Sequence, residues 1–123
     1  MIMHILAQTL VALIALEHFY ILWLEMFMWT KPLGRKTFSA LPSDLFEKTK
    51  ALAANQGLYN GFLAAGLVWS IVVTDAEWSR NIALFFLSCV AIAGVYGSLT
   101  AMKKIFFTQA LPALIALIVL LLS

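Results

Sequence analysis

Apolar residues along the chain form four long runs that are separated by short polar segments. The runs cover residues 3–29, 51–73, 82–101 and 105–122. Each run is close to the length of about 20 apolar residues that a helix needs to cross a hydrocarbon core of about 30 Å. The pattern therefore predicts an all-α protein, a four-transmembrane-helix bundle that forms a single membrane domain over residues 1–123.

The polar segments between the runs are residues 30–50, 75–81 and 103–104. The first of them holds two prolines and most of the charge, and the second, DAEWSRN, is interpreted as a short turn. Asp44 is followed three residues later by Glu47, which is the spacing of a capping box. This spacing indicates that the second long helix begins in water near residue 44.

Composition supports a membrane protein and excludes several other classes. Hydrophobic residues make up 63% of the chain and charged residues 11%, whereas soluble domains carry about 25% charged residues. A net charge of +2, without a basic cluster interleaved with aromatic residues, argues against a nucleic-acid partner. Cys89 is the single cysteine, so the chain forms no internal disulfide, and it is interpreted as a small apolar residue. The first run follows no basic region and is expected to be a retained span.

Basic residues are distributed unequally between the predicted loops. Those expected on one side are Lys31, Arg35, Lys36, Lys48, Lys50, Lys103 and Lys104. The other side carries only Arg80. By the positive-inside rule, both termini lie outside and the basic loops lie in the cytoplasm of a multi-pass protein of the inner or plasma membrane. Trp29 and Trp78 fall at predicted boundaries, where aromatic belts form.

Three ionisable residues interrupt the first apolar run. Glu17, His18 and Glu25 share one broad helical face, with Tyr20 beyond them, because seven residues bring a helix almost back to the same direction. An acidic side chain that faces lipid at the centre of a membrane costs about 2.5–3.5 kcal/mol on insertion scales. The three groups are therefore expected to face one another or the second helix and to act as a catalytic, proton-handling set.

Further polar side chains in the runs concentrate in the predicted cytoplasmic half. The residues expected to bind a substrate there are Tyr20, Asn55, Gln56, Tyr59, Asn60, Tyr96 and Gln109. Pro112 has no N–H, so the backbone carbonyl one turn earlier loses its helical donor and becomes a further polar group of this region. This segregation predicts a polar pocket that opens toward the cytoplasm.

Other interpretations of these residues remain open. The acids and His18 can form an ion pair that only fixes helix packing, and amides with glycines commonly hold membrane helices together. Two carboxylates and one imidazole can also ligate a metal. No second histidine lies in a span, since His4 is placed at the outer interface and interpreted as solvated, so no metal ligand is assigned and the sequence indicates no particular cofactor.

Three motifs, EHFYILWLEMFMW, NQGLYNG and GVYGS, occur in this order along the chain. In this respect the sequence resembles a family of small bacterial four-span membrane proteins that is known as a domain of unknown function. The resemblance covers nearly the whole chain. It implies the four-span fold and the importance of these positions, and it implies no activity.

Three functions fit these features. The first is a membrane enzyme or binder that acts on a hydrophobic small molecule by carboxylate and histidine acid–base chemistry. The second is a proton-coupled transporter or exporter subunit, which would have to dimerise, with Gly61, Gly66, Gly94 and Gly97 offering surfaces for it. The third is an accessory subunit of a larger membrane complex. Membrane lipid is the expected partner of all three, and a homo-oligomer is compatible with each.

Overall fold

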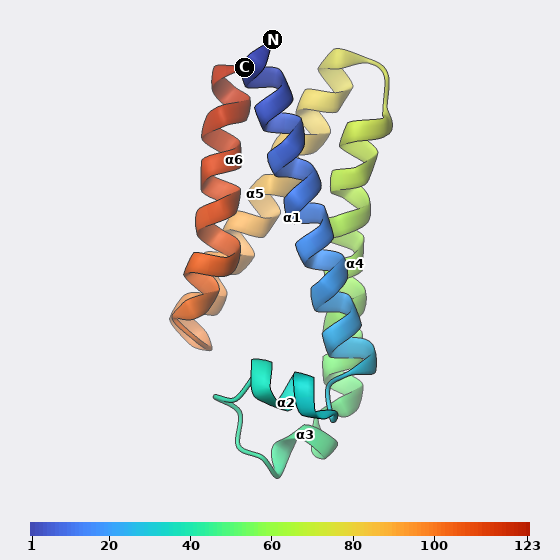
Figure 1. Cartoon of the computed structure of the whole chain (residues 1–123), viewed down its shortest axis with the longest axis vertical. Coiled ribbons are helices and arrows are strands. Elements are labelled where there is room, and N and C mark those ends of the chain that lie inside the picture. Colours follow the sequence, from blue (N-terminus) through green and yellow to red (C-terminus); the bar gives the residue numbers. More distant parts are fainter. The chain divides into compact units, whose positions relative to one another are not determined.

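The computed structural model describes all 123 residues, and every regular element in it is helical. Along the chain these elements are α1 (Ile2–Phe27), α2 (Pro32–Thr37), α3 (Leu45–Lys48), α4 (Lys50–Val72), α5 (Ala76–Thr100), the π-helix η1 (Phe106–Ala110) and α6 (Leu111–Leu122) (Figure 1). The predicted all-α class is confirmed. Each of the four predicted apolar runs is helical over most of its length.

Two of the helices, α1 and α5, are long and apolar enough to cross a membrane, judged by length and composition alone. The segment Phe106–Leu122 is a shorter apolar helix. α4 has 23 residues and contains the polar NQGLYNG stretch, and it is not one of these two helices. The number of spans and the side on which the termini lie stay predictions.

The chain divides into two compact units, which we describe separately. The core unit consists of residues 1–16 and 63–123, and the loop unit consists of residues 17–62. α1 and α4 each contribute residues to both units. The prediction of one domain over residues 1–123 stays a prediction.

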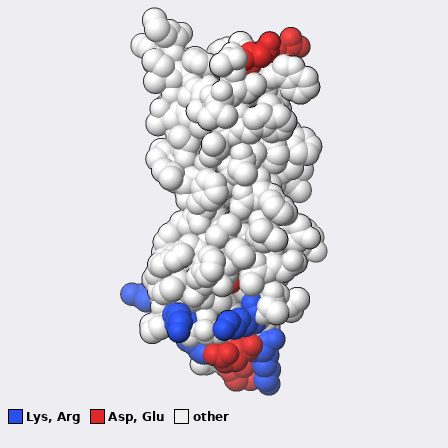
Figure 2. Space-filling model, turned by 90° about the vertical axis from the view of Figure 1, so that its right-hand side faces the viewer, with Lys and Arg blue, Asp and Glu red and all other residues white.

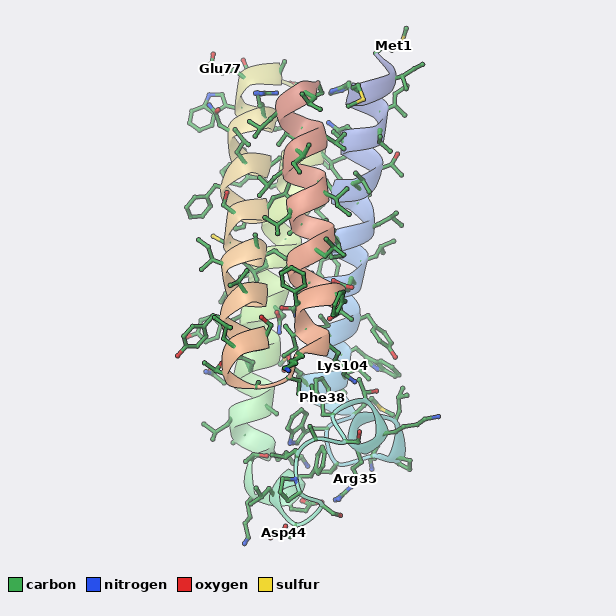
Figure 3. All side chains as sticks on the ribbon, turned by 90° about the vertical axis from the view of Figure 1, so that its left-hand side faces the viewer. Met1, Arg35, Phe38, Asp44, Glu77 and Lys104 are labelled. Carbon is green, nitrogen blue, oxygen red and sulfur yellow. The ribbon has the colours of Figure 1, made fainter.

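The interior of the core unit is built from small and branched aliphatic side chains of α1, α4, α5 and α6. Its buried members are Ala7, Val11, Ile14, Ala15, Leu67, Ala83, Leu87, Val90, Ala91, Ala113, Ala116, Val119 and Leu120. The many alanines let the helix backbones approach closely. Met1 and Glu77 lie at one end of this unit, and Lys104 lies at the other (Figure 3).

The backbones of α5 and η1 approach each other closely at Gly94. A Cβ atom placed on Gly94 would lie 2.5 Å from the backbone nitrogen of Ala110. Just beyond, Pro112 has no N–H to donate to the preceding turn. The N–H of Leu111 instead donates to the carbonyl of Phe106, five residues earlier, so the turn before the proline is wound as a π-helix. With Ala110 in this position, no side chain larger than that of glycine fits at residue 94.

The predicted turn over residues 75–81 is wrong, because α5 already begins at Ala76. Asp75 is the N-cap of α5, and its Oδ1 accepts a hydrogen bond from the backbone N–H of Trp78 at 2.9 Å. The polar residues after it form the first turns of the helix. Capping by Asp and the helical preference of Ala, Glu and Arg outweigh the local loss of hydrophobicity.

This cap gives a first testable prediction. Asp75→Ala should lower the free energy of unfolding by about 1 kcal/mol, because an N–H of the first turn loses its side-chain acceptor. Glu77→Ala, an equally exposed acid two residues later, is the matched control. Denaturant titration followed by circular dichroism measures both, and equal stability of the two variants would contradict the role of Asp75.

The loop unit contains one helix that the sequence pattern did not predict, α2, and its helix α3 is separate from α4 although the pattern predicted one continuous helix from about residue 44. The ring of Trp29 lies 5.0 Å from that of Phe38 and 5.2 Å from that of Phe46, between ring centroids. The indole Nε1 of Trp29 also donates to Thr49 Oγ1 at 3.0 Å. Burial of these rings folds the segment into short helices.

The predicted capping box at Asp44 and Glu47 is also wrong. Asp44 has a helical conformation, and its side chain accepts no capping hydrogen bond. The four-residue helix α3 ends at Lys48, and α4 begins at Lys50. Packing of Phe46, which is 1% exposed, determines the path of the chain here.

Candidate functional site

The loop unit brings together two pairs of the residues selected from the sequence. The first pair is Glu17 and His18 on α1, whose Oε1 and Nδ1 atoms are 3.8 Å apart. The His18 side chain is 1% exposed and that of Glu17 is 33% exposed. Successive helical residues point about 100° apart, yet the longer glutamate side chain reaches back toward the imidazole.

Glu17 has an unsatisfied atom beside His18. Its Oε1 is buried and accepts no hydrogen bond. The separation from His18 Nδ1 is too long for a hydrogen bond, which normally needs about 3.2 Å or less. A buried acceptor without a donor costs about 1–3 kcal/mol. Glu17 Oε1 is thus an acceptor to which a bound molecule could donate.

The second pair joins α1 to α4. Asn60 Nδ2 donates to Glu25 Oε1 at 2.6 Å, and Glu25 is 8% exposed. Two glycines of α4 make this contact possible. A Cβ atom on Gly57 would lie 3.0 Å from Glu25 Cβ, and one on Gly61 would lie 2.5 Å from Leu22 Cδ1. The glycines of NQGLYNG therefore form the face of α4 that contacts α1, and Asn60 extends from α4 to Glu25 of α1.

The remaining polar residues of the loop unit lie on its surface. Asn55, Gln56 and Tyr59 of α4 are exposed. Tyr20 of α1 is 48% exposed and packs its ring against Trp23, 5.8 Å between centroids. The sequence analysis predicted that these side chains line a polar pocket together with the acids. The structure shows a contact with an acid only for Asn60.

Tyr96 and Gln109 belong to the core unit. Tyr96 is 69% exposed on α5, and Gln109 is half-buried in η1. Their participation in a site with the acids of α1 stays a prediction. No group of three or more His, Cys, Asp or Glu side chains is arranged to hold a metal ion.

The core unit also contains a polar cavity that sequence reasoning missed. Its volume is about 420 Å³, and its polar lining side chains are His4, Gln8, Ser70, Thr74, Ser79, Arg80 and Ser123. The expectation that polar side chains of the spans concentrate in the cytoplasmic half left out Gln8 and Ser70, and Arg80 was considered only for the orientation of the chain. The signal that could have found the cavity is the spacing of Gln8 and Val11 on one face of α1, toward which the α4–α5 turn folds.

Comparison with known proteins adds a family but no activity. The sequence model of the family described as "Protein of unknown function (DUF1304)" matches residues 12–121. The uncharacterized protein YpaA of Lactococcus lactis subsp. lactis (strain IL1403) is 37% identical over 117 residues, which are 94% of this chain and 97% of that protein. No solved structure matches the chain.

Proposed function

The chain belongs to the DUF1304 family, and from this premise we propose that it is an integral membrane protein that binds a hydrophobic small molecule and acts on it by acid–base chemistry. The reacting groups are Glu17 and His18, with Glu25 as a second acid. The proposed protein is a four-helix bundle in the cell membrane, with four spans, both termini outside and the basic loops in the cytoplasm.

The surfaces of the two units support insertion in a membrane. Large apolar side chains cover the outside of α5, where Phe85, Ile92 and Leu99 are 63%, 70% and 81% exposed. Contiguous apolar surface of this kind is unfavourable in water but is ordinary solvation in lipid. On the face shown in Figure 2, the basic side chains of the loop unit gather on the segment that carries α2 and α3, while the helices show almost no charge. This charge distribution is the one expected for a cytoplasmic loop.

The observation that carries the chemical part of the proposal is the buried Oε1 of Glu17, which accepts no hydrogen bond. A hydroxyl or N–H group of a ligand would supply the missing donor. His18, 3.8 Å away, would exchange a proton with the carboxylate or with the ligand. Hydrogen bonds between catalytic groups are often long before substrate binds and shorten in the complex.

Glu25 and Asn60 have a different role in this proposal. Because Asn60 already donates to Glu25, that carboxylate is held in place and orients the part of the ligand nearest the loop. The other residues of the loop unit proposed to orient the substrate are Tyr20, Asn55, Gln56 and Tyr59. They supply neutral donors and acceptors of the kind that stabilise developing charge.

The test is analysis of molecules that remain bound to the gently purified full-length chain. Wild type should retain a hydrophobic small molecule that mass spectrometry of the extract identifies. Glu17→Gln should bind it about tenfold more weakly, because a charge-assisted hydrogen bond becomes a neutral one. Glu47→Gln, which changes an exposed glutamate in the loop unit, is the matched control and should bind as wild type does.

Two outcomes would overturn this proposal. Equal ligand retention by wild type and Glu17→Gln would remove Glu17 from the site. Glu17-dependent solute flux across proteoliposomes under a pH gradient would instead establish proton-coupled transport, in which intramembrane acids act as relays. If the chain is unstable unless a larger membrane protein accompanies it, the role of accessory subunit gains support.

A further inference from the structure

The cavity of the core unit is independent of the Glu17–His18 site and has a different chemistry. It lies at the end of the unit where Met1 and Glu77 are found (Figure 3), between α1, the α4–α5 turn, the start of α5 and the end of α6. Its volume of about 420 Å³ falls within the range of small-molecule sites, about 300–1,000 Å³.

Arg80 is the cationic side chain that distinguishes this cavity. It is half-buried, and its Nη1 donates to the backbone carbonyl of Leu120 at 2.7 Å. A guanidinium has five N–H donors in a fixed plane, so four of them donate to no protein atom. Arg80 also forms no ion pair with Asp75 or Glu77, which lie outside the cavity. The hydrogen bond to Leu120 fixes the guanidinium while leaving most of its donors available.

The neutral polar groups of the lining also favour an anion. No acidic side chain lines the cavity. The hydroxyls of Ser70 and Ser79 already donate to the backbone carbonyls of Leu67 and Ser70, at 2.6 and 2.5 Å. The amide of Gln8 has no protein partner and can donate together with Arg80. The donors of the cavity that remain available therefore include the guanidinium of Arg80, which is held in place, and the amide of Gln8.

The remainder of the wall is apolar and includes Ala7, Val11, Ile71 and Ala83. A ligand that fits both parts has an anionic head and a hydrocarbon chain. A planar guanidinium binds phosphate oxygens in a bidentate manner. We propose that this cavity is a binding site for an amphiphile with a phosphate-ester head, which Arg80 and Gln8 hold while its apolar chain lies against the walls.

Binding of decyl phosphate to the full-length chain in a neutral detergent tests the proposal, with isothermal calorimetry as the measurement. Decyl phosphate should bind measurably more tightly than decanol, which lacks the anionic head. Arg80→Gln should weaken binding about tenfold or more, because hydrogen bonds from charged donors are the stronger ones. Lys103→Gln, which removes an exposed cation from the same unit, should have no effect.

A second variant covers the case in which Arg80→Gln fails to fold after losing the bond to Leu120. Gln8→Leu leaves that bond intact and should weaken the binding of decyl phosphate severalfold. Wild-type affinity in every folded variant, or equal binding of decyl phosphate and decanol, would overturn the proposal.

The source of the phosphate ester is decided by a second pair of probes. In lipid nanodiscs, Arg80-dependent enrichment of phosphatidylglycerol over phosphatidylcholine would identify a membrane lipid as the ligand. Binding of decyl phosphate without such enrichment would identify a soluble phosphate ester, and both results support the site.

Discussion

Gly94→Ala should lower the free energy of unfolding by about 2 kcal/mol. The added methyl group would lie 2.5 Å from the backbone nitrogen of Ala110 and 2.8 Å from its Cα atom. Backbone atoms cannot rotate away as a side chain can, so α5 and η1 must separate. Overpacking of this kind costs about 1–3 kcal/mol or more, and the better helix propensity of alanine returns only about 1 kcal/mol.

Gly97→Ala is the matched control on the same helix. Its added Cβ would lie 3.1 Å from Ile105 Cγ2, the end of a side chain that can shift by a few tenths of an ångström. We expect this variant to be as stable as wild type or slightly more stable. Unfolding by sodium dodecyl sulfate in mixed micelles, followed by circular dichroism, measures both variants. If Gly94→Ala were the more stable of the two, the close approach of Gly94 to Ala110 would be disproved.

Asn60→Leu should destabilise the protein by about 2–3 kcal/mol. It removes the donor that lies 2.6 Å from Glu25 Oε1 and leaves a carboxyl group that is 8% exposed without a partner. When one member of a buried pair is removed, the other keeps its desolvation penalty without a compensating hydrogen bond. This costs about 1–3 kcal/mol, and more for a charged group. The same denaturant titration measures the effect.

Asn55→Leu makes the same chemical change at an exposed position of α4 and should shift stability by no more than about 0.5 kcal/mol. The double variant Glu25→Leu with Asn60→Leu gives a sharper test. Replacing both partners by apolar groups should restore much of the lost stability. Additive losses in the double variant would show that Asn60 and Glu25 do not interact.

Hydrophobic runs predicted the long helices well, because length and apolar content are local properties of the chain. The start of α5 was misplaced because hydropathy treats Glu77 and Arg80 as loop residues, whereas Asp75 caps a helix that includes them. The short helix α2, and the separation of α3 from α4, were not predictable from a local pattern. They depend on contacts of Trp29 with Phe38 and Phe46, which are 9 and 17 residues away along the sequence.

For the candidate site, the cost of exposing an acid to lipid led to the prediction that the acids of the first helix face one another or the second long helix, and Glu25 does contact Asn60 of α4. Spacing could not distinguish Asn60 from Asn55, because that choice depends on which stripe of α4 carries the contacting glycines. The interaction of Glu17 with His18 depends on side-chain rotamers, on which periodicity gives no information. The cavity around Arg80 depends on how three separate segments meet at one end of the core unit.

The π-helical turn over Phe106–Ala110 also changes how the C-terminal segment should be projected. One additional residue in a single turn rotates everything after it by about 100° relative to a regular helix. A single regular helical wheel drawn through residues 105–122 therefore gives the wrong direction for Ala113 relative to Gln109. Deleting one residue from this turn would realign the two halves of the wheel, so insertions and deletions here would act as rotations of the whole last helix.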